Sequence, residues 1–156
     1  MEISLSNRQK RVAIDPAKLR RAAKKILSVL GCKDAEISIV VVDDAEITRL
    51  NRRYFRRPGP TNVISFPLQE GKPGNLQAPL LGDVVISADT AARHARAAGV
   101  RTGDEILFLL VHGVLHLVGY DHEGPAAERR EMEAKEREIF GGLVNGLKKG
   151  VKGPRG

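Results

Sequence analysis

The feature that most constrains the fold of this 156-residue chain is an apolar segment, ILFLLVHGVLHLV at residues 106–118, that carries two histidines. The segment is well short of the roughly 20 apolar residues that a membrane-spanning helix needs, and the two imidazoles interrupt it. It therefore predicts a buried central helix, which begins with a capping box of Thr102 and Glu105 and ends at Gly119.

The remaining segments predict helices and strands that can pack on this central helix. Residues 15–31 form an amphipathic helix with Asp15 as the N-cap and Pro16 in the first turn. The run EISIVVVDD at 36–44 predicts a strand that is covered on both faces. Three more helices are expected in residues 43–55, 89–98 and 125–140, and two short strands in 62–67 and 82–87, separated by a flexible Gly- and Pro-rich loop.

These elements predict an α/β fold with a single domain. We expect a small mixed β-sheet of about four strands packed with about five helices. The domain is expected in residues 1–140. Residues 141–156 are expected to form a basic, Gly-rich, disordered tail, because Gly and Lys cannot bury enough apolar surface to become ordered.

The balance of charged residues indicates the class of partner. The chain has 26 Lys and Arg against 19 Asp and Glu, a formal net charge of +7, which favours a polyanion such as nucleic acid or an anionic membrane surface. Charge alone does not choose between these two; because the apolar segment at 106–118 is too short to span a membrane, we expect no membrane partner. Cys32 is the only cysteine, and the first residues lack the apolar run of a signal peptide, so we expect a reducing, cytoplasmic location.

Three of the four histidines, His112, His116 and His122, lie in the segment HGVLHLVGYDH. On a helix the first two are about 40° apart and one turn along, so their rings can converge, and the chain reversal after Gly119 can bring the third to the same point. Unpaired imidazoles on a buried helix would each cost a few kcal/mol, which makes ordinary core histidines the weaker interpretation. Three nitrogen ligands with an open fourth position are typical of catalytic zinc, and we predict one Zn²⁺ ion.

The spacing H-x3-H-x2-G-x2-H is that of the zinc metalloprotease signature H-E-x-x-H-x-x-G-x-x-H, so the central helix is metalloprotease-like. Those proteases use the Glu beside the first ligand as the general base. This chain has Gly113 there, which has no side chain to accept a proton. A degenerate metalloprotease is therefore the least favoured function.

Three blocks of the sequence, spread over most of the chain, resemble the YbeY family of bacterial endoribonucleases and rRNA maturation factors. HGVLHLVGYDH is close to the family pattern H-G-x-L-H-L-x-G-Y-D-H, PTNVISFP to P-T-[DN]-V-L-S-F, and LLGDVVIS to L-G-D-[IV]-x-I-[SC]. The resemblance implies an α/β domain with zinc at the three histidines and a single-strand-specific RNase. It further implies maturation of the 16S rRNA 3′ end and ribosome quality control, with single-stranded RNA, 16S rRNA and the ribosome or its small subunit as partners.

The chain departs from the family pattern at one position. The family has an Arg directly after the Tyr that ends the second helix, whereas Phe55 follows Tyr54 here. Arg56 and Arg57 come next; we expect Arg56 to take the catalytic role and both to bind RNA, because a guanidinium can hold phosphate oxygens bidentately. Few aromatic residues can stack on bases, and the candidates are Tyr54, Phe55, Phe66 and Tyr120.

Two carboxylates are candidates to orient a ligand histidine by accepting its second ring N–H. Asp83 begins a predicted strand, where a simple turn residue is the alternative, and Asp121 precedes His122. The leading hypothesis is a zinc-dependent endoribonuclease. A non-catalytic ribosome assembly or RNA-binding factor with a structural zinc is the alternative, which Phe55 in the place of the Arg favours.

Overall fold

The computed structural model describes residues 1–69 and 79–150, and within them it has four strands and five helices. The strands are β1 (Glu2–Asn7), β2 (Glu36–Val42), β3 (Val63–Pro67) and β4 (Leu80–Ser87). The helices are α1 (Pro16–Val29), α2 (Asp44–Phe55), α3 (Ala88–Ala98), α4 (Thr102–Leu117) and α5 (Ala126–Gly150). The expected α/β fold is confirmed. Most of the expected Gly- and Pro-rich loop, residues 70–78, lies outside the described residues.

The four strands form one mixed sheet in the order β1-β2-β4-β3. β1, β2 and β4 run parallel to one another, and β3 runs antiparallel to β4. The parallel strands are connected through helices, because parallel pairing needs a long crossover. β3 is an edge strand of this sheet, so one of its sides is left for contacts other than strand pairing.

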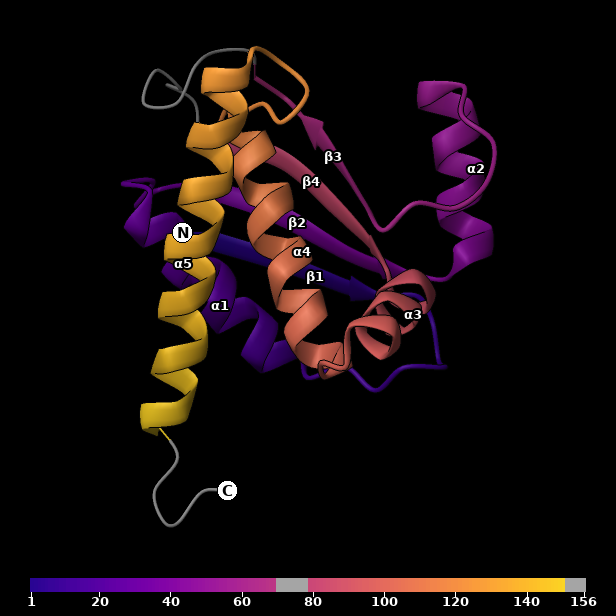
Figure 1. Ribbon diagram of the computed structural model, residues 1–156, viewed down its shortest axis with the longest axis horizontal. Helices are drawn as coiled ribbons and strands as arrows, with labels where there is room; N and C mark the ends of the chain where they lie inside the picture. The colour runs from indigo at the N-terminus through magenta and orange to yellow at the C-terminus, as the bar shows by residue number, and fades with distance from the viewer. Residues whose placement is uncertain (70–78, 151–156) are drawn as a thin grey trace.

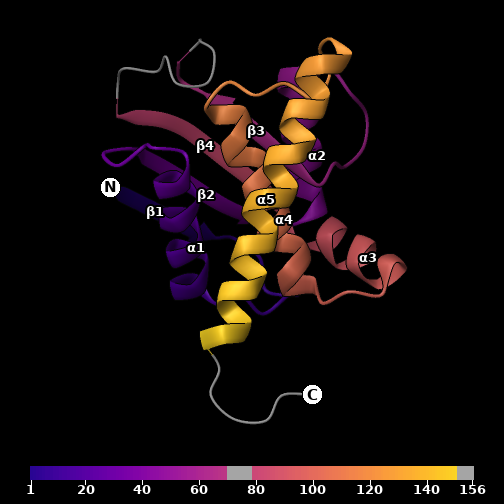
Figure 2. The ribbon, with the colours of Figure 1, turned by 60° about the vertical axis from the view of Figure 1, so that its left-hand side comes forward.

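The helices cover the two faces of the sheet unequally. α1 and α4 pack on one face and α5 lies over α4, whereas α2 lies on the other face (Figures 1 and 2). Side chains alternate along β4: Val84 and Ile86 belong to the large core with α1 and α4, and Val85 belongs to a small cluster with Ile47 of α2. α4 is therefore the buried central helix that the sequence predicts.

The beginning of α4 differs from the expected capping box. The N-cap residue is Arg101, whose carbonyl accepts the N–H groups of Asp104 and Glu105, each at 3.1 Å, and no side chain caps this end. Thr102 is already the first helical residue, so its hydroxyl is one position too late to cap the helix. The capping-box prediction is wrong, while Gly119 follows the helix end with a φ of 103°, as expected of a helix-ending glycine.

α5 extends further than the sequence indicates. The expected domain end at residue 140 falls inside this helix, which continues to Gly150. Leu143 is 7% exposed and packs in the large core with Met132 and Ile139, so the apolar stripe that holds α5 in place continues past residue 140. Residues 151–156 of the expected tail lie outside the described residues. No helix within the described ranges is long and apolar enough to cross a membrane.

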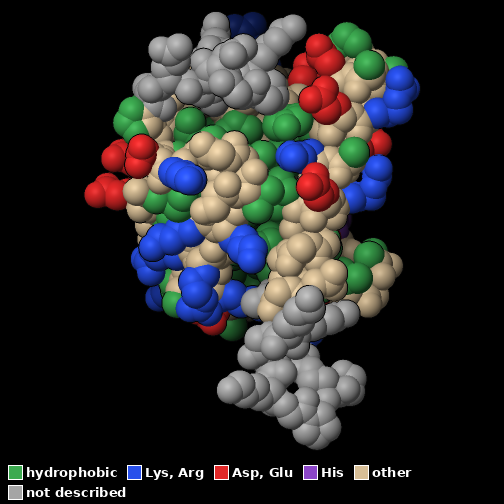
Figure 3. All heavy atoms as spheres, turned by 90° about the vertical axis from the view of Figure 1, so that its left-hand side faces the viewer, with side chains coloured by type: hydrophobic (Ala, Val, Ile, Leu, Met, Phe, Trp, Pro, Cys, Tyr) green, Lys and Arg blue, Asp and Glu red, His purple; other side chains and the backbone are tan. Residues whose placement is uncertain are grey.

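Positive charge gathers in two places on the surface. The exposed side of α1 carries Arg20, Arg21, Lys24 and Lys25, and Figure 3 shows Lys and Arg side chains crowded on the face that includes α1. The second place is the C-terminal end of α2 and the residues after it, RRYFRR at 52–57.

Candidate metal centre and cleft

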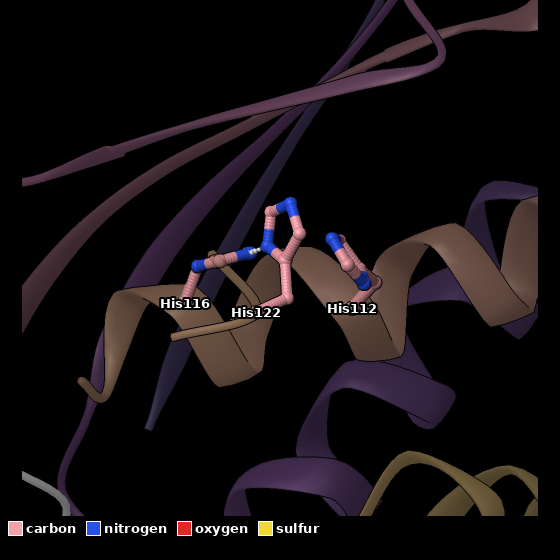
Figure 4. Close-up of side chains that lie close together, drawn as sticks. All are labelled: His112, His116 and His122. Atoms are coloured by element: carbon pink, nitrogen blue, oxygen red, sulfur yellow. Dashed lines mark hydrogen bonds between the residues drawn. The ribbon is translucent and has the colours of Figure 1, made fainter. Parts of the chain in front are cut away.

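The three clustered histidines come together at the end of α4. His112 and His116 are one turn apart on the helix, and their ring centroids are 4.8 Å apart. His122 follows in the next loop, with its ring centroid 5.0 Å from that of His112 and 4.6 Å from that of His116. Figure 4 shows the three rings grouped on one side of the helix. One nitrogen from each ring lies within 4.8 Å of the other two, so the cluster can hold a metal ion.

A turn after α4 returns His122 to the helix. The N–H of Gly119 donates to the carbonyl of His116 at 3.1 Å, and the φ of 103° at Gly119 is left-handed, a conformation that residues with a Cβ rarely adopt. Asp121 then accepts the N–H of Glu123 through Oδ1 at 2.8 Å. These two local hydrogen bonds reverse the chain, and the third histidine comes back to the first two.

Glu136 of α5 makes the most buried polar contact of the centre. The residue is 6% exposed, and its Oε2 lies 2.8 Å from Nδ1 of His112. Because a carboxylate accepts, Nδ1 donates its proton and Nε2 keeps the lone pair that a metal ion needs. Sequence reasoning misses Glu136, because α5 meets α4 only in the folded chain. The sequence carries one signal that could have found it: Glu136 has the helical spacing of the apolar residues Met132 and Ile139, which puts an acid on the buried face of α5.

The environment of His116 favours its neutral form. The pKa of His116 is lowered to about 4, chiefly by burial and next by the charges of His112 and His122, which outweigh the opposite effect of Asp121 and Glu136. At pH 7 the ring is therefore neutral, as a metal ligand must be. Nε2 of His116 lies 2.6 Å from Nδ1 of His122, a hydrogen-bond distance that requires one proton between the two nitrogens. A neutral imidazole nitrogen is a ligand that suits zinc, copper, iron and nickel, so these residues fit a metal ion.

A cleft of about 360 Å³ opens beside the histidines. Its other walls come from the edge strand β3, the C-terminal end of α2 and the loop between them. Asn51 of α2 donates to the carbonyl of Gly59 at 3.1 Å and so ties this loop to the helix. Phe55 brings an aromatic ring to the cleft and Arg57 brings a guanidinium.

The two candidate arginines occupy different positions. Arg57 lines the cleft, and its Nη2 lies 3.9 Å from Oε1 of Glu123 on the loop that carries His122. Arg56 is the C-cap residue of α2, with a left-handed φ of 53°, and is not among the residues that line the cleft. The turn of the chain at the C-cap thus brings Arg57, rather than Arg56, to the cleft.

The structure gives different surroundings to the two carboxylates expected to orient a ligand histidine. Asp83 precedes Val84, whose side chain meets α4 at Gly113, and side chains alternate along a strand, so Asp83 faces the opposite side of the sheet. Asp121 is exposed and accepts from the backbone of Glu123, so it shapes the loop. The contact expected of these two residues is made by Glu136.

α4 lies so close to β4 that position 113 has no room for a side chain. A Cβ on Gly113 would lie 2.5 Å from Cγ1 of Val84 and 3.3 Å from Oγ of Ser65. The Ser65 hydroxyl donates to the carbonyl of Gly113 at 2.8 Å across the same contact. A Glu at this position, as in the metalloproteases, would therefore clash with Val84.

Comparison with known proteins identifies relatives across nearly the whole chain. The family model described as Endoribonuclease YbeY matches residues 4–144. Curated proteins called Endoribonuclease YbeY from Geobacter metallireducens and Geobacter sulfurreducens are each 52% identical to the chain, over 90% and 94% of its length and 94% and 98% of theirs. A Thermotoga maritima protein solved in solution has a TM-score of 0.58 at 23% identity, over 98% of this chain and 99% of that one, which is a likeness of fold.

Proposed function

Because this chain belongs to the YbeY family, we propose that it is a metal-dependent endoribonuclease whose active site is the cleft beside His112, His116 and His122. The observation that carries the proposal is the convergence of three imidazoles on the wall of an open cleft. Purely structural zinc sites usually close the coordination shell with a fourth protein ligand. The 52% identity to proteins called Endoribonuclease YbeY supports RNA as the substrate.

We propose one Zn²⁺ ion, held by the three histidines. Bound there, zinc would act as a Lewis acid toward a phosphate oxygen and lower the pKa of a coordinated water. Glu136 holds His112 in the tautomer that binds metal. We assign the catalytic cation to Arg57 instead of Arg56, because Arg57 lines the cleft and a guanidinium can bind two phosphate oxygens as negative charge develops.

The finer biological role rests on the family resemblance and on charge. We propose that the substrate is single-stranded RNA, that the enzyme acts in maturation of the 16S rRNA 3′ end and in ribosome quality control, and that it works on the small ribosomal subunit in the cytoplasm. The basic stretch at residues 52–57 borders the cleft and supplies phosphate contacts that any RNA offers. Arg56 belongs to this stretch and is proposed to bind the RNA backbone.

The proposal is tested by metal analysis combined with RNA cleavage. Protein purified without added metal is expected to contain about one zinc ion per chain, to lose cleavage of an unstructured RNA on chelation, and to regain it with added zinc. His116→Ala is expected to lose both metal and activity. His94→Ala, which removes the exposed histidine of α3, is the matched control and should retain both. Cleavage by His116→Ala at the wild-type rate would contradict the proposal.

One observation favours a second function, a non-catalytic RNA-binding factor with a structural zinc: Phe55 stands where the family pattern has Arg. The same experiment separates the two functions. A structural role predicts that RNA binding is retained and that no chelator-sensitive cleavage is found at any metal concentration.

A further inference from the structure

Two aromatic rings at the end of α2 remain half exposed. Tyr54 is 54% exposed and Phe55 is 45% exposed. Both rings contact Phe66 of β3: Tyr54 meets it edge-on with the centroids 5.2 Å apart, and Phe55 meets it at a tilt with the centroids 6.0 Å apart. Phe66 itself packs against the small core on the α2 face. The two outer rings are therefore held in place on one side and open on the other.

These rings border the candidate active site. Phe55 lines the same cleft as His112, His116 and His122. Tyr54 precedes it and shares its support, so the aromatic surface continues outward from the cleft. A leucine would cover Phe66 with a similar apolar area, so covering the core does not by itself require a ring here. A ring differs in presenting a flat π face.

Cations surround the two rings. The guanidinium carbon of Arg53 lies 5.4 Å from the ring centroid of Tyr54, and Arg57 lines the cleft next to Phe55. The stretch RRYFRR has no acidic residue, so a strand of nucleic acid would meet cations for its phosphates and rings for its bases. This combination of aromatic rings and positive charge is how proteins bind single strands without base-specific hydrogen bonds. A protein partner would need acidic residues placed beside its apolar ones, whereas every nucleotide of a strand carries both a phosphate and a base.

We propose that Phe55 and Tyr54, supported by Phe66, are a stacking platform that binds an unpaired nucleobase of the RNA whose phosphate lies at the metal centre. The inference rests on the proposed function and adds to it the group that selects the substrate. A base inside a duplex has both faces covered by its neighbours, so only an unpaired base can stack on Phe55. The platform therefore accounts for a preference for single strands through ring contacts, with phosphate contacts supplying affinity that does not depend on sequence.

The platform is tested with the holoenzyme and short uridine-rich RNA strands in which one abasic nucleotide is moved along the chain. In the wild-type enzyme, removing the base that stacks on Phe55 should raise KM about fivefold or more, with a smaller change in kcat. Phe55→Leu keeps the apolar side chain and loses the π face. It should raise KM for the intact strand and remove the additional penalty of the abasic position, whereas Phe55→Tyr should behave like wild type. Leu68→Ala, which truncates another exposed apolar residue, is the matched control.

A spectroscopic readout locates the base directly. 2-Aminopurine at the sensitive position should lose fluorescence on rapid mixing with wild-type enzyme and should not do so with Phe55→Leu; the chain has no tryptophan to interfere. If circular dichroism shows that Phe55→Leu does not fold, the same measurement is made with Tyr54→Leu and with 2-aminopurine at the adjacent nucleotide. An abasic penalty of equal size in wild type and in a folded platform variant would overturn the platform alone. Absence of RNA binding by the wild-type protein would overturn the platform together with the proposed function.

Discussion

At the scale of single residues, Glu136 shows how far the metal centre depends on a second helix. In Glu136→Gln, an amide of similar volume replaces the carboxylate, so the hydrogen bond from Nδ1 of His112 loses its charge. We expect the affinity for zinc to fall about 10- to 100-fold, measured by competition with a chromophoric chelator. Glu133→Gln changes an exposed acid on the same helix and should bind zinc as the wild type does. Unchanged affinity in Glu136→Gln would mean that His112 is oriented without this carboxylate.

The glycine at position 113 allows a second test at this scale. Gly113→Ala places a Cβ against Val84 and should lower the free energy of unfolding by about 1–3 kcal/mol, measured by urea denaturation. Gly103→Ala, in the first turn of the same helix, meets nothing within 4 Å and should stabilise the protein by up to about 1 kcal/mol through helix propensity. Adding Val84→Ala to Gly113→Ala should recover part of the loss. Wild-type stability of Gly113→Ala would argue against this close approach of α4 to the sheet.

Residues near one another in the sequence are the ones that sequence reasoning brings together correctly. His112 and His116 are placed by the period of a helix, and His122 by the turn that follows Gly119, so their convergence depends on local geometry. Arg57 and Glu136 reach the site through the C-cap of α2 and the packing of α5 on α4. Neither contact leaves a local pattern that selects it over neighbouring residues of the same type.

At the scale of elements, a polar network joins the beginnings of α2 and α3 beside the sheet. Asp44 accepts from Ser87 at 2.7 Å, from Thr90 at 2.6 Å and from Arg93 at 2.6 Å. Its backbone N–H also donates to Asp89 at 3.0 Å. Burial raises the pKa of Asp44, but the hydrogen bonds and the charge of Arg93 outweigh burial and hold this pKa below its usual 3.8. The ionised carboxylate therefore connects the two helices.

The lowered pKa makes this connection dependent on pH. A carboxyl with a lower pKa in the folded state contributes stability above its unfolded pKa, and this contribution is lost as the pH falls through the folded pKa. We expect Asp44→Asn to lower the free energy of unfolding by about 1–2 kcal/mol at pH 7, and by progressively less below pH 3.8. Urea denaturation at a series of pH values measures the difference. Asp34→Asn, at an exposed site, is the control, and a deficit in Asp44→Asn that is independent of pH would contradict the role of the charge.

At the scale of the whole molecule, the sequence predicts the kinds of element better than their arrangement. The α/β class, the mixed sheet and the buried central helix are confirmed, because hydrophobic period and apolar content report them directly. β1 has only Ile3 and Leu5 as large apolar residues, and its pairing with β2 is a contact between distant segments. The strand order β1-β2-β4-β3 depends on such contacts, and so does the continuation of α5, which Leu143 anchors.

The unequal covering of the sheet has a consequence for how the enzyme meets its substrate. His112 and His116 sit on α4, whose apolar side chains belong to the large core, and His122 sits on the loop that follows. Phe55 is carried by α2, whose underlying cluster contains only four buried residues, Val42, Ile47, Ile64 and Val85. Regions with less buried apolar surface open at lower free energy than the core does. The wall of the cleft that is proposed to stack a base is therefore expected to open at a lower free energy than α4, which carries His112 and His116.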